Sequence, residues 1–196
     1  LFSQASQGER ALDCLQQAEK IAYASDDMVG LSNHQCKLAL LMAKHSPASS
    51  GADGQRALEK LRLSLEACKK LGVNAGVAEA TLVHGQIAGL QNNQAVALQK
   101  IKVSIDLFRD MGDKGNVARA LCLAAKNGGV TAQGVVQLQE ALEIYRAMQD
   151  SLGESDALQQ TAELESALGQ NDRAAKNWID CLAVKRAIGD IKVSSA

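Results

Sequence analysis

The stretch ALQKIKVSIDLFRDMGDKGNVARA at residues 97–120 decides the fold class. It begins with a small residue, continues with apolar residues at helical spacing, and then reaches a glycine-containing turn. The stretch ALEKLRLSLEACKKLGVNAGVAEA at residues 57–80 has the same order. Further copies occupy residues 11–30, 134–157 and 174–193. Because self-similarity at a near-constant period is typical of repeat architectures, the sequence predicts a repeat protein.

Each copy carries three anchor positions, a small residue followed by two more anchors after four and seven residues. These offsets place the three side chains on one side of a helix, which can then pack against a neighbouring helix. The first anchors are Ala11, Ala57, Ala97, Gly134 and Ala174, separated by 46, 40, 37 and 40 residues. The later anchors are Leu15 and Ala18, Leu61 and Ser64, Ile101 and Ser104, Leu138 and Ala141, and Trp178 and Cys181.

The segments between the copies are also helical in pattern. Residues 76–90 and 154–168 carry apolar side chains at helical spacing, and short polar turns follow at residues 91–94 and 169–172. Gly or Asn in such a turn can take the left-handed conformation that ends a helix. The unit is therefore helix, tight turn, helix. We expect an all-α fold, an α-solenoid of stacked antiparallel helix hairpins.

This order of small, apolar and turn residues resembles the tetratricopeptide repeat (TPR) family. The best-matching copy consists of Ala162, Gly169, Ala174, Trp178 and Cys181. The period is longer than the usual ~34 residues of a TPR, and glycine turns replace the family's proline. These turns are predicted at Gly72, Gly112-Asp113 and Gly189-Asp190. Both departures resemble the extended subtype of roughly 40 residues found in kinesin light chains, in LGN-type modulators of G-protein signalling and in rapsyn.

The repeat count and the chain ends predict the domain organisation. We expect a single TPR-like solenoid over residues 1–196, with about four to five repeats. Residues 45–56, which include Pro47, Gly51 and Gly54, are predicted to form an inserted loop. A solenoid normally ends in units with a polar outer side, and neither end shows one. We therefore expect either that this chain is a segment of a longer array or that a partner covers its ends.

Composition excludes several classes of partner. The chain has 21 basic and 22 acidic side chains and a formal net charge of -1, so counterion release would not drive nucleic-acid binding. Residues 1–196 contain no signal-peptide pattern and no apolar run near the ~18 residues of a membrane span. We expect no nucleic acid as partner, no direct membrane insertion, and an intracellular, cytoplasmic location, with an organelle interior left open.

Residues that could carry chemistry do not form a catalytic pattern. The five cysteines are far apart, lack CxxC spacing, and are predicted to be buried in helices. The three histidines lack metal-ligand spacing. The acidic pairs Glu140 with Glu143 and Glu163 with Glu165 are predicted to be solvated. We therefore expect no enzyme activity, no catalytic residues, no cofactor and no metal.

Stacked hairpins create a concave groove lined by the first helix of each repeat. The TPR resemblance implies six groove-facing residues: Glu79, Gln86, Arg119, Lys126, Gln159 and Glu163. Their mixed charges favour a peptide held through several polar contacts. Arg119 matches part of the carboxylate clamp of some TPR domains, but the neighbouring clamp positions are Leu82, Gln86 and Leu123, so that clamp is incomplete.

The predicted function is a protein–protein interaction scaffold or adaptor that binds another protein or a peptide. We expect it to be a structural subunit of a hetero-oligomeric complex, using the groove or the edges of the solenoid. The alternative is a regulatory, ligand-sensing helical-repeat region of a larger enzyme or signalling protein.

Overall fold

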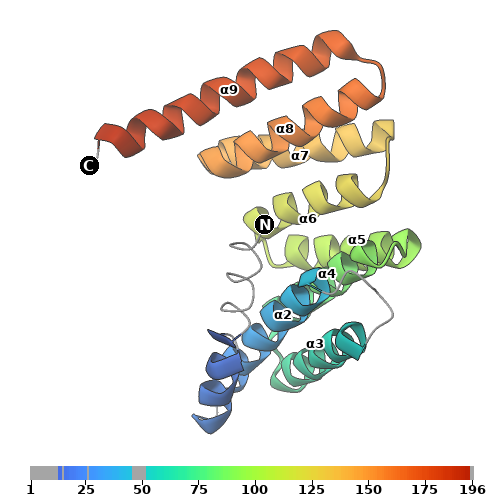
Figure 1. Cartoon of the computed structure of the whole chain (residues 1–196), viewed down its shortest axis with the longest axis vertical. Coiled ribbons are helices and arrows are strands. Elements are labelled where there is room, and N and C mark those ends of the chain that lie inside the picture. Colours follow the sequence, from blue (N-terminus) through green and yellow to red (C-terminus); the bar gives the residue numbers. More distant parts are fainter. Residues whose placement is uncertain (1–12, 15, 26, 46–51, 195–196) are drawn as a thin grey trace. The chain divides into compact units, whose positions relative to one another are not determined.

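A computed structural model describes residues 13–14, 16–25, 27–45 and 52–194 of the chain. All regular secondary structure in these residues is helical (Figure 1), which confirms the predicted all-α class. Residues 16–24 are helical and are followed by eight longer helices. These are α2 (Met28–His45), α3 (Ala52–Leu71), α4 (Asn74–Leu90), α5 (Gln94–Asp110), α6 (Lys114–Asn127), α7 (Ala132–Ala147), α8 (Ser151–Ala167) and α9 (Asn171–Ser194).

The chain divides into two compact units, residues 1–107 and 108–196, which are described separately. In unit 1, α2 packs against α3 and α4, and α3 also packs against α4. Small and branched apolar side chains form the core between these three helices. They are Cys36, Ala39, Ala57, Leu61, Ala80, Val83 and Ile87.

In unit 2, consecutive helices pack in pairs, α6 with α7, α7 with α8, and α8 with α9. Helices α6 and α8, the first helices of two successive hairpins, also touch each other. The connections between these helices are short, so neighbours run antiparallel. Each unit is thus built from stacked helix hairpins, as the sequence predicted.

The ends of the helices follow from local chemistry. Asp113, Thr131 and Asp150 precede α6, α7 and α8, and each side chain accepts a hydrogen bond from a backbone N–H of the first turn. Gly72 and Gly112 have φ of 68° and 70°, the left-handed conformation predicted for them. These caps and turns therefore set where one helix ends and the next helix begins.

The anchor positions are buried in nearly every copy. Ala57, Ala97 and Ala141 are fully buried, and Gly134 and Ala174 are buried as well. The exceptions are Ala18, which is half-buried, and Trp178, which is 38% exposed. Ala11 and Leu15 lie outside the described residues. The recurring small residues therefore mark close helix contacts, as predicted from their period.

Two predicted boundaries are wrong. The Gly189-Asp190 turn is absent, because α9 continues to Ser194 and Gly189 does not take the left-handed conformation. A single helical glycine costs only about 1 kcal/mol, which the rest of a long helix can offset. The predicted loop 45–56 is too long, since α2 includes His45 and α3 begins at Ala52. Residues 46–51 lie outside the described part of the chain.

Candidate functional site

Unit 2 contains a hollow of about 570 Å³ between α6 and α8. Its polar rim includes Lys126 from α6 and Gln159 and Glu163 from α8. Three of the six residues predicted to face the groove are therefore brought together here. Lys126 and Glu163 are exposed, while Gln159 is half-buried. The hollow thus offers a cation, a carboxylate and an amide at one opening.

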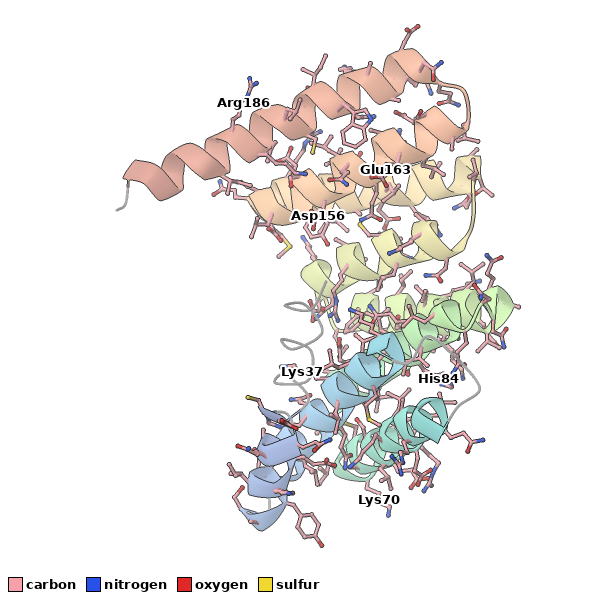
Figure 2. The ribbon with its side chains drawn as sticks, viewed as in Figure 1. Lys37, Lys70, His84, Asp156, Glu163 and Arg186 are labelled. Carbon is pink, nitrogen blue, oxygen red and sulfur yellow. The ribbon has the colours of Figure 1, made fainter. Side chains whose placement is uncertain are left out.

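Hydrogen bonds hold the α8 side of this rim in place. Gln159 and Glu163 are one helical turn apart, and Gln159 Nε2 donates to Glu163 Oε1 at 3.0 Å. The Oε1 atom of Gln159 accepts from Lys185 Nζ of α9 at 2.8 Å. Glu163 projects from α8 in Figure 2. Because both ends of the Gln159 amide are engaged, its orientation at the opening is restricted.

The floor of the hollow is apolar. Leu123 of α6, Leu138 of α7 and Leu164 of α8 line it, and Leu138 is only 1% exposed. Val130, in the connection between α6 and α7, also lines it and is 55% exposed. Burial of apolar surface stabilises an occupant by about 25 cal/mol per Å². The hollow can therefore accept an apolar side chain while polar groups at the rim bind its backbone.

Arg119 lies elsewhere on α6. It is half-buried on α6, and its charge lowers the pKa of the Tyr145 phenol of α7. Burial outweighs that effect and, with the charges of Cys122, Asp150 and Asp156, raises the pKa of Tyr145 to about 12. Arg119 does not line the α6–α8 hollow. A charge reversal at this position would disturb packing as well as any groove, so it is a poor probe of binding.

Glu79 and Gln86 lie on α4 of unit 1 and are both half-buried. They are seven residues apart and therefore share one side of the helix. His84 (Figure 2) lies between them in the sequence and is half-buried. Desolvation, followed by the charge of Lys100, lowers the pKa of its imidazole. A single groove lined by all six predicted residues stays a prediction, because these two residues belong to the other unit.

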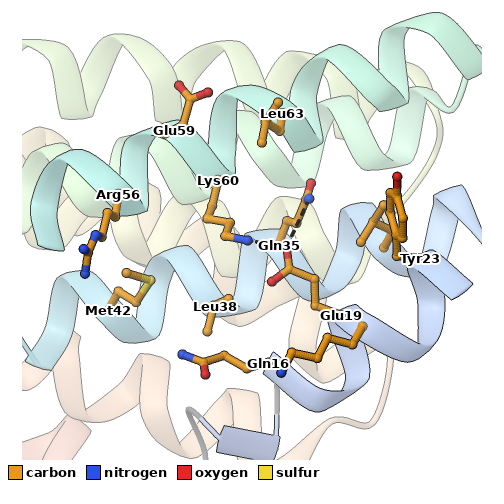
Figure 3. A pocket seen from close by; sticks show the side chains of 12 residues that line it. Gln16, Glu19, Tyr23, Gln35, Leu38, Met42, Arg56, Glu59, Lys60 and Leu63 are labelled. Carbon is orange, nitrogen blue, oxygen red and sulfur yellow. Dashed lines mark hydrogen bonds and ion pairs between the residues drawn. The ribbon is translucent and has the colours of Figure 1, made fainter.

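A larger hollow in unit 1 was not predicted. It measures about 870 Å³ and lies between residues 16–24, α2 and α3 (Figure 3). Glu19 crosses it, accepting hydrogen bonds from Gln35 Nε2 at 3.3 Å and from Lys60 Nζ. Leu38 and Met42 form an apolar wall. Its residues come from three helices, and sequence periodicity does not indicate which side chains gather around such a space.

One predicted solvated carboxylate is buried. Glu165 is only 2% exposed, and its Oε2 accepts a hydrogen bond from Asn177 Nδ2 of α9 at 2.7 Å. The prediction for this residue was wrong, because the side of α8 that carries it packs against α9. Asn177 partly satisfies the buried carboxyl group, so Glu165 holds the α8–α9 hairpin together rather than belonging to a surface site.

The cysteines were predicted to be buried, and this is wrong for Cys14. Cys14 is exposed, whereas Cys36, Cys68, Cys122 and Cys181 are buried. Burial raises the pKa of Cys36 and of Cys122 to about 11, so these thiols stay protonated near neutral pH. The thiolate is the nucleophile in thiol chemistry.

We therefore expect one thiol per folded chain to react rapidly with Ellman's reagent, and all five after denaturation. Cys14→Ser should abolish the rapid reaction without affecting the slow ones. Two or more rapid thiols in the folded protein would contradict the described burial.

Among the described residues, no group of three or more His, Cys, Asp or Glu side chains is arranged to hold a metal ion. No helix in that part of the chain has the length and apolar character needed to cross a bilayer. No protein-family model matches the chain, and a search of curated proteins found no significant similarity.

Proposed function

We propose that the chain is a protein–protein interaction scaffold or adaptor that binds an extended peptide segment of a partner in the α6–α8 hollow. The observation that carries this proposal is the convergence of Lys126, Gln159 and Glu163 around an apolar floor. Apolar pockets with a few placed polar groups are typical of binding sites. The order of the anchor residues supports a relationship to TPR proteins.

The hollow favours a particular kind of peptide. Lys126 on α6 would pair with an acidic group of the ligand, and Glu163 on α8 with a basic group or a backbone N–H. An apolar side chain between them would fill the space above Leu138. A segment carrying acidic, apolar and basic residues in turn therefore fits better than one with a single sign of charge.

Two further features support a role as a subunit of an intracellular assembly. All five cysteines are free, which is usual in reducing compartments. Stacked hairpins expose a large side surface relative to their volume, which suits contact with other subunits. We infer a hetero-oligomeric complex in the cytoplasm as the setting of this function.

The proposal can be tested with a phage-displayed library of random linear peptides selected against the full chain. Affinities of the selected peptides would be measured by fluorescence anisotropy. Lys126→Glu and Glu163→Lys should each weaken binding about tenfold, equivalent to the loss of one charge-assisted contact of about 1.4 kcal/mol. The matched control is Lys114→Glu, the same change at the other end of α6.

Selected peptides that bind the rim variants and the control variant equally would contradict the proposed site. Far-UV circular dichroism of each variant checks that folding is retained. Both rim side chains are exposed, so no loss of stability is expected from either substitution.

A further inference from the structure

The side of α9 that points away from α8 exposes large apolar side chains. Ile179 is 67% exposed and Leu182 is 52% exposed. Trp178, four residues after the buried Ala174, lies at the edge of this side and is 38% exposed. The opposite side of α9, with Ala174 and Cys181, is buried. Within the described residues, α8 is the one helix that packs against α9. Exposed apolar residues grouped on one side of a helix mark an interaction surface.

Comparison with α7 shows which kind of surface this is. The positions one, four and eight residues after the first anchor of α7 are Val135, Leu138 and Leu142. All three are buried in unit 2, where α7 packs between α6 and α8. The same positions in α9 are Ala175, Trp178 and Leu182. Two positions on the exposed side of α9, Ala175 and Leu182, are therefore interface positions in α7, whereas the position of Ile179 is occupied in α7 by the exposed Gln139.

A charged position also recurs. Twelve residues after the first anchor, α7 has Arg146 and α9 has Arg186. Arg146 Nε lies 2.7 Å from Oε1 of Glu154, in the first turn of the antiparallel neighbour α8. Arg186 forms no ion pair within the described part of the chain, and it projects away from α8 (Figure 2). By analogy, a helix covering α9 would carry a carboxylate in its first turn.

Helix α9 itself has that carboxylate. Its first turn contains Asp172, and only α8 and α9 among the helices α4 to α9 have an acidic residue there. The exposed residues Asp172, Ala175, Ile179, Leu182 and Arg186 follow spacings of three and four residues. Such spacings form a continuous stripe along one side of a helix, as in two-stranded coiled coils.

We propose that the chain forms a homodimer in which two copies of α9 pack antiparallel through this stripe. Under two-fold symmetry the same residues serve both copies. Ile179 and Leu182 lie in the centre and bury each other's apolar surface. At each end, Arg186 of one copy meets Asp172 of the other, which reproduces the contact between Arg146 and Glu154.

The oligomeric state of the full chain tests this proposal. We expect analytical ultracentrifugation to show a dimer at chain concentrations of tens of micromolar. Ile179→Asp or Leu182→Asp should make the protein monomeric, with unchanged circular dichroism because both side chains are exposed. The matched control is Val136→Asp, which alters a side chain of α7 that is 55% exposed and should leave the dimer intact.

Charge exchange tests the antiparallel arrangement. Arg186→Asp and Asp172→Arg should each weaken the dimer at least about tenfold, because each creates two like-charge contacts across the axis. The double variant should restore the dimer. Singly substituted proteins that remain as tightly dimeric as the original chain, or a double variant without rescue, would overturn this pairing.

The tryptophan provides an independent readout of the surface used. Trp178 is the only tryptophan in the chain, and it borders the stripe. Its emission should move to shorter wavelength as the protein is concentrated and the dimer forms. A monomeric chain at all concentrations, or a dimer without a shift in emission, would overturn the assignment to α9. The first of these outcomes would instead assign this surface to a helix of a different protein.

Discussion

Ala97→Asp is expected to lower the free energy of unfolding by about 4 kcal/mol. Ala97 is fully buried on α5, where α5 approaches α4 closely. A Cβ built on Gly85 of α4 would lie 3.1 Å from the carbonyl oxygen of Ala97 and 2.7 Å from Cγ1 of Ile101. A carboxylate in this contact would lack both space and water, so the helices would have to separate.

The matched control for this substitution is Ala95→Asp, two residues earlier in the same helix. Ala95 is exposed in the first turn of α5, where a carboxylate complements the helix dipole. This variant should keep the original stability. Urea unfolding followed by far-UV circular dichroism measures both changes. Equal losses in the two variants, or no loss in Ala97→Asp, would contradict the repeat register.

Repeated local signals made the fold predictable from the sequence. The anchor Ala97 and its equivalents recur with apolar partners at helical spacing, and the turn residue Gly112 can adopt a conformation that most residues avoid. Each signal lies within a few residues of the structure that it specifies. The period then indicates that one hairpin packs against the next, because a single hairpin cannot bury its own apolar side.

The burial of individual side chains was less predictable, because it depends on which helices surround a position. Trp178 follows the anchor pattern but is 38% exposed, because it lies at the edge of the side of α9 that packs against α8. Glu165 looks like half of a solvated acidic pair but packs beneath Asn177. Gly189 resembles a turn residue, although the helix continues through it. In each case packing between helices overrides the local sequence signal.

The candidate site shows the same limit. The TPR resemblance implied that Lys126, Gln159 and Glu163 face a groove, and all three line the α6–α8 hollow. The apolar floor at Leu138 was not predicted, because a leucine at an anchor position indicates only core packing. Whether a space remains above it depends on the length of α6 and on the connection at residues 128–131. Both determine how far apart the packed helices lie, which the residue type at one position does not indicate.

Gly153→Ala is expected to lower the free energy of unfolding by about 3 kcal/mol through overpacking. A Cβ at Gly153 of α8 would lie 2.4 Å from both Cδ1 and Cε1 of the Tyr145 ring on α7. Tyr145 is only 9% exposed, so its ring cannot simply move aside. The added methyl group must therefore push α7 and α8 apart.

Gly115→Ala is the matched control, since Gly115 occupies the first turn of α6 as Gly153 occupies that of α8. The nearest atom to a Cβ there would be the flexible Cε of Met148 at 3.3 Å, with Asp113 Oδ1 and Met148 Sδ at 3.9 Å. The free energy of unfolding of this variant should stay the same or rise by up to about 1 kcal/mol, because alanine restricts the unfolded chain. Urea unfolding followed by Trp178 emission reports on the unit that contains both glycines. Similar losses in the two variants would show that the Tyr145 contact does not limit the approach of α7 and α8.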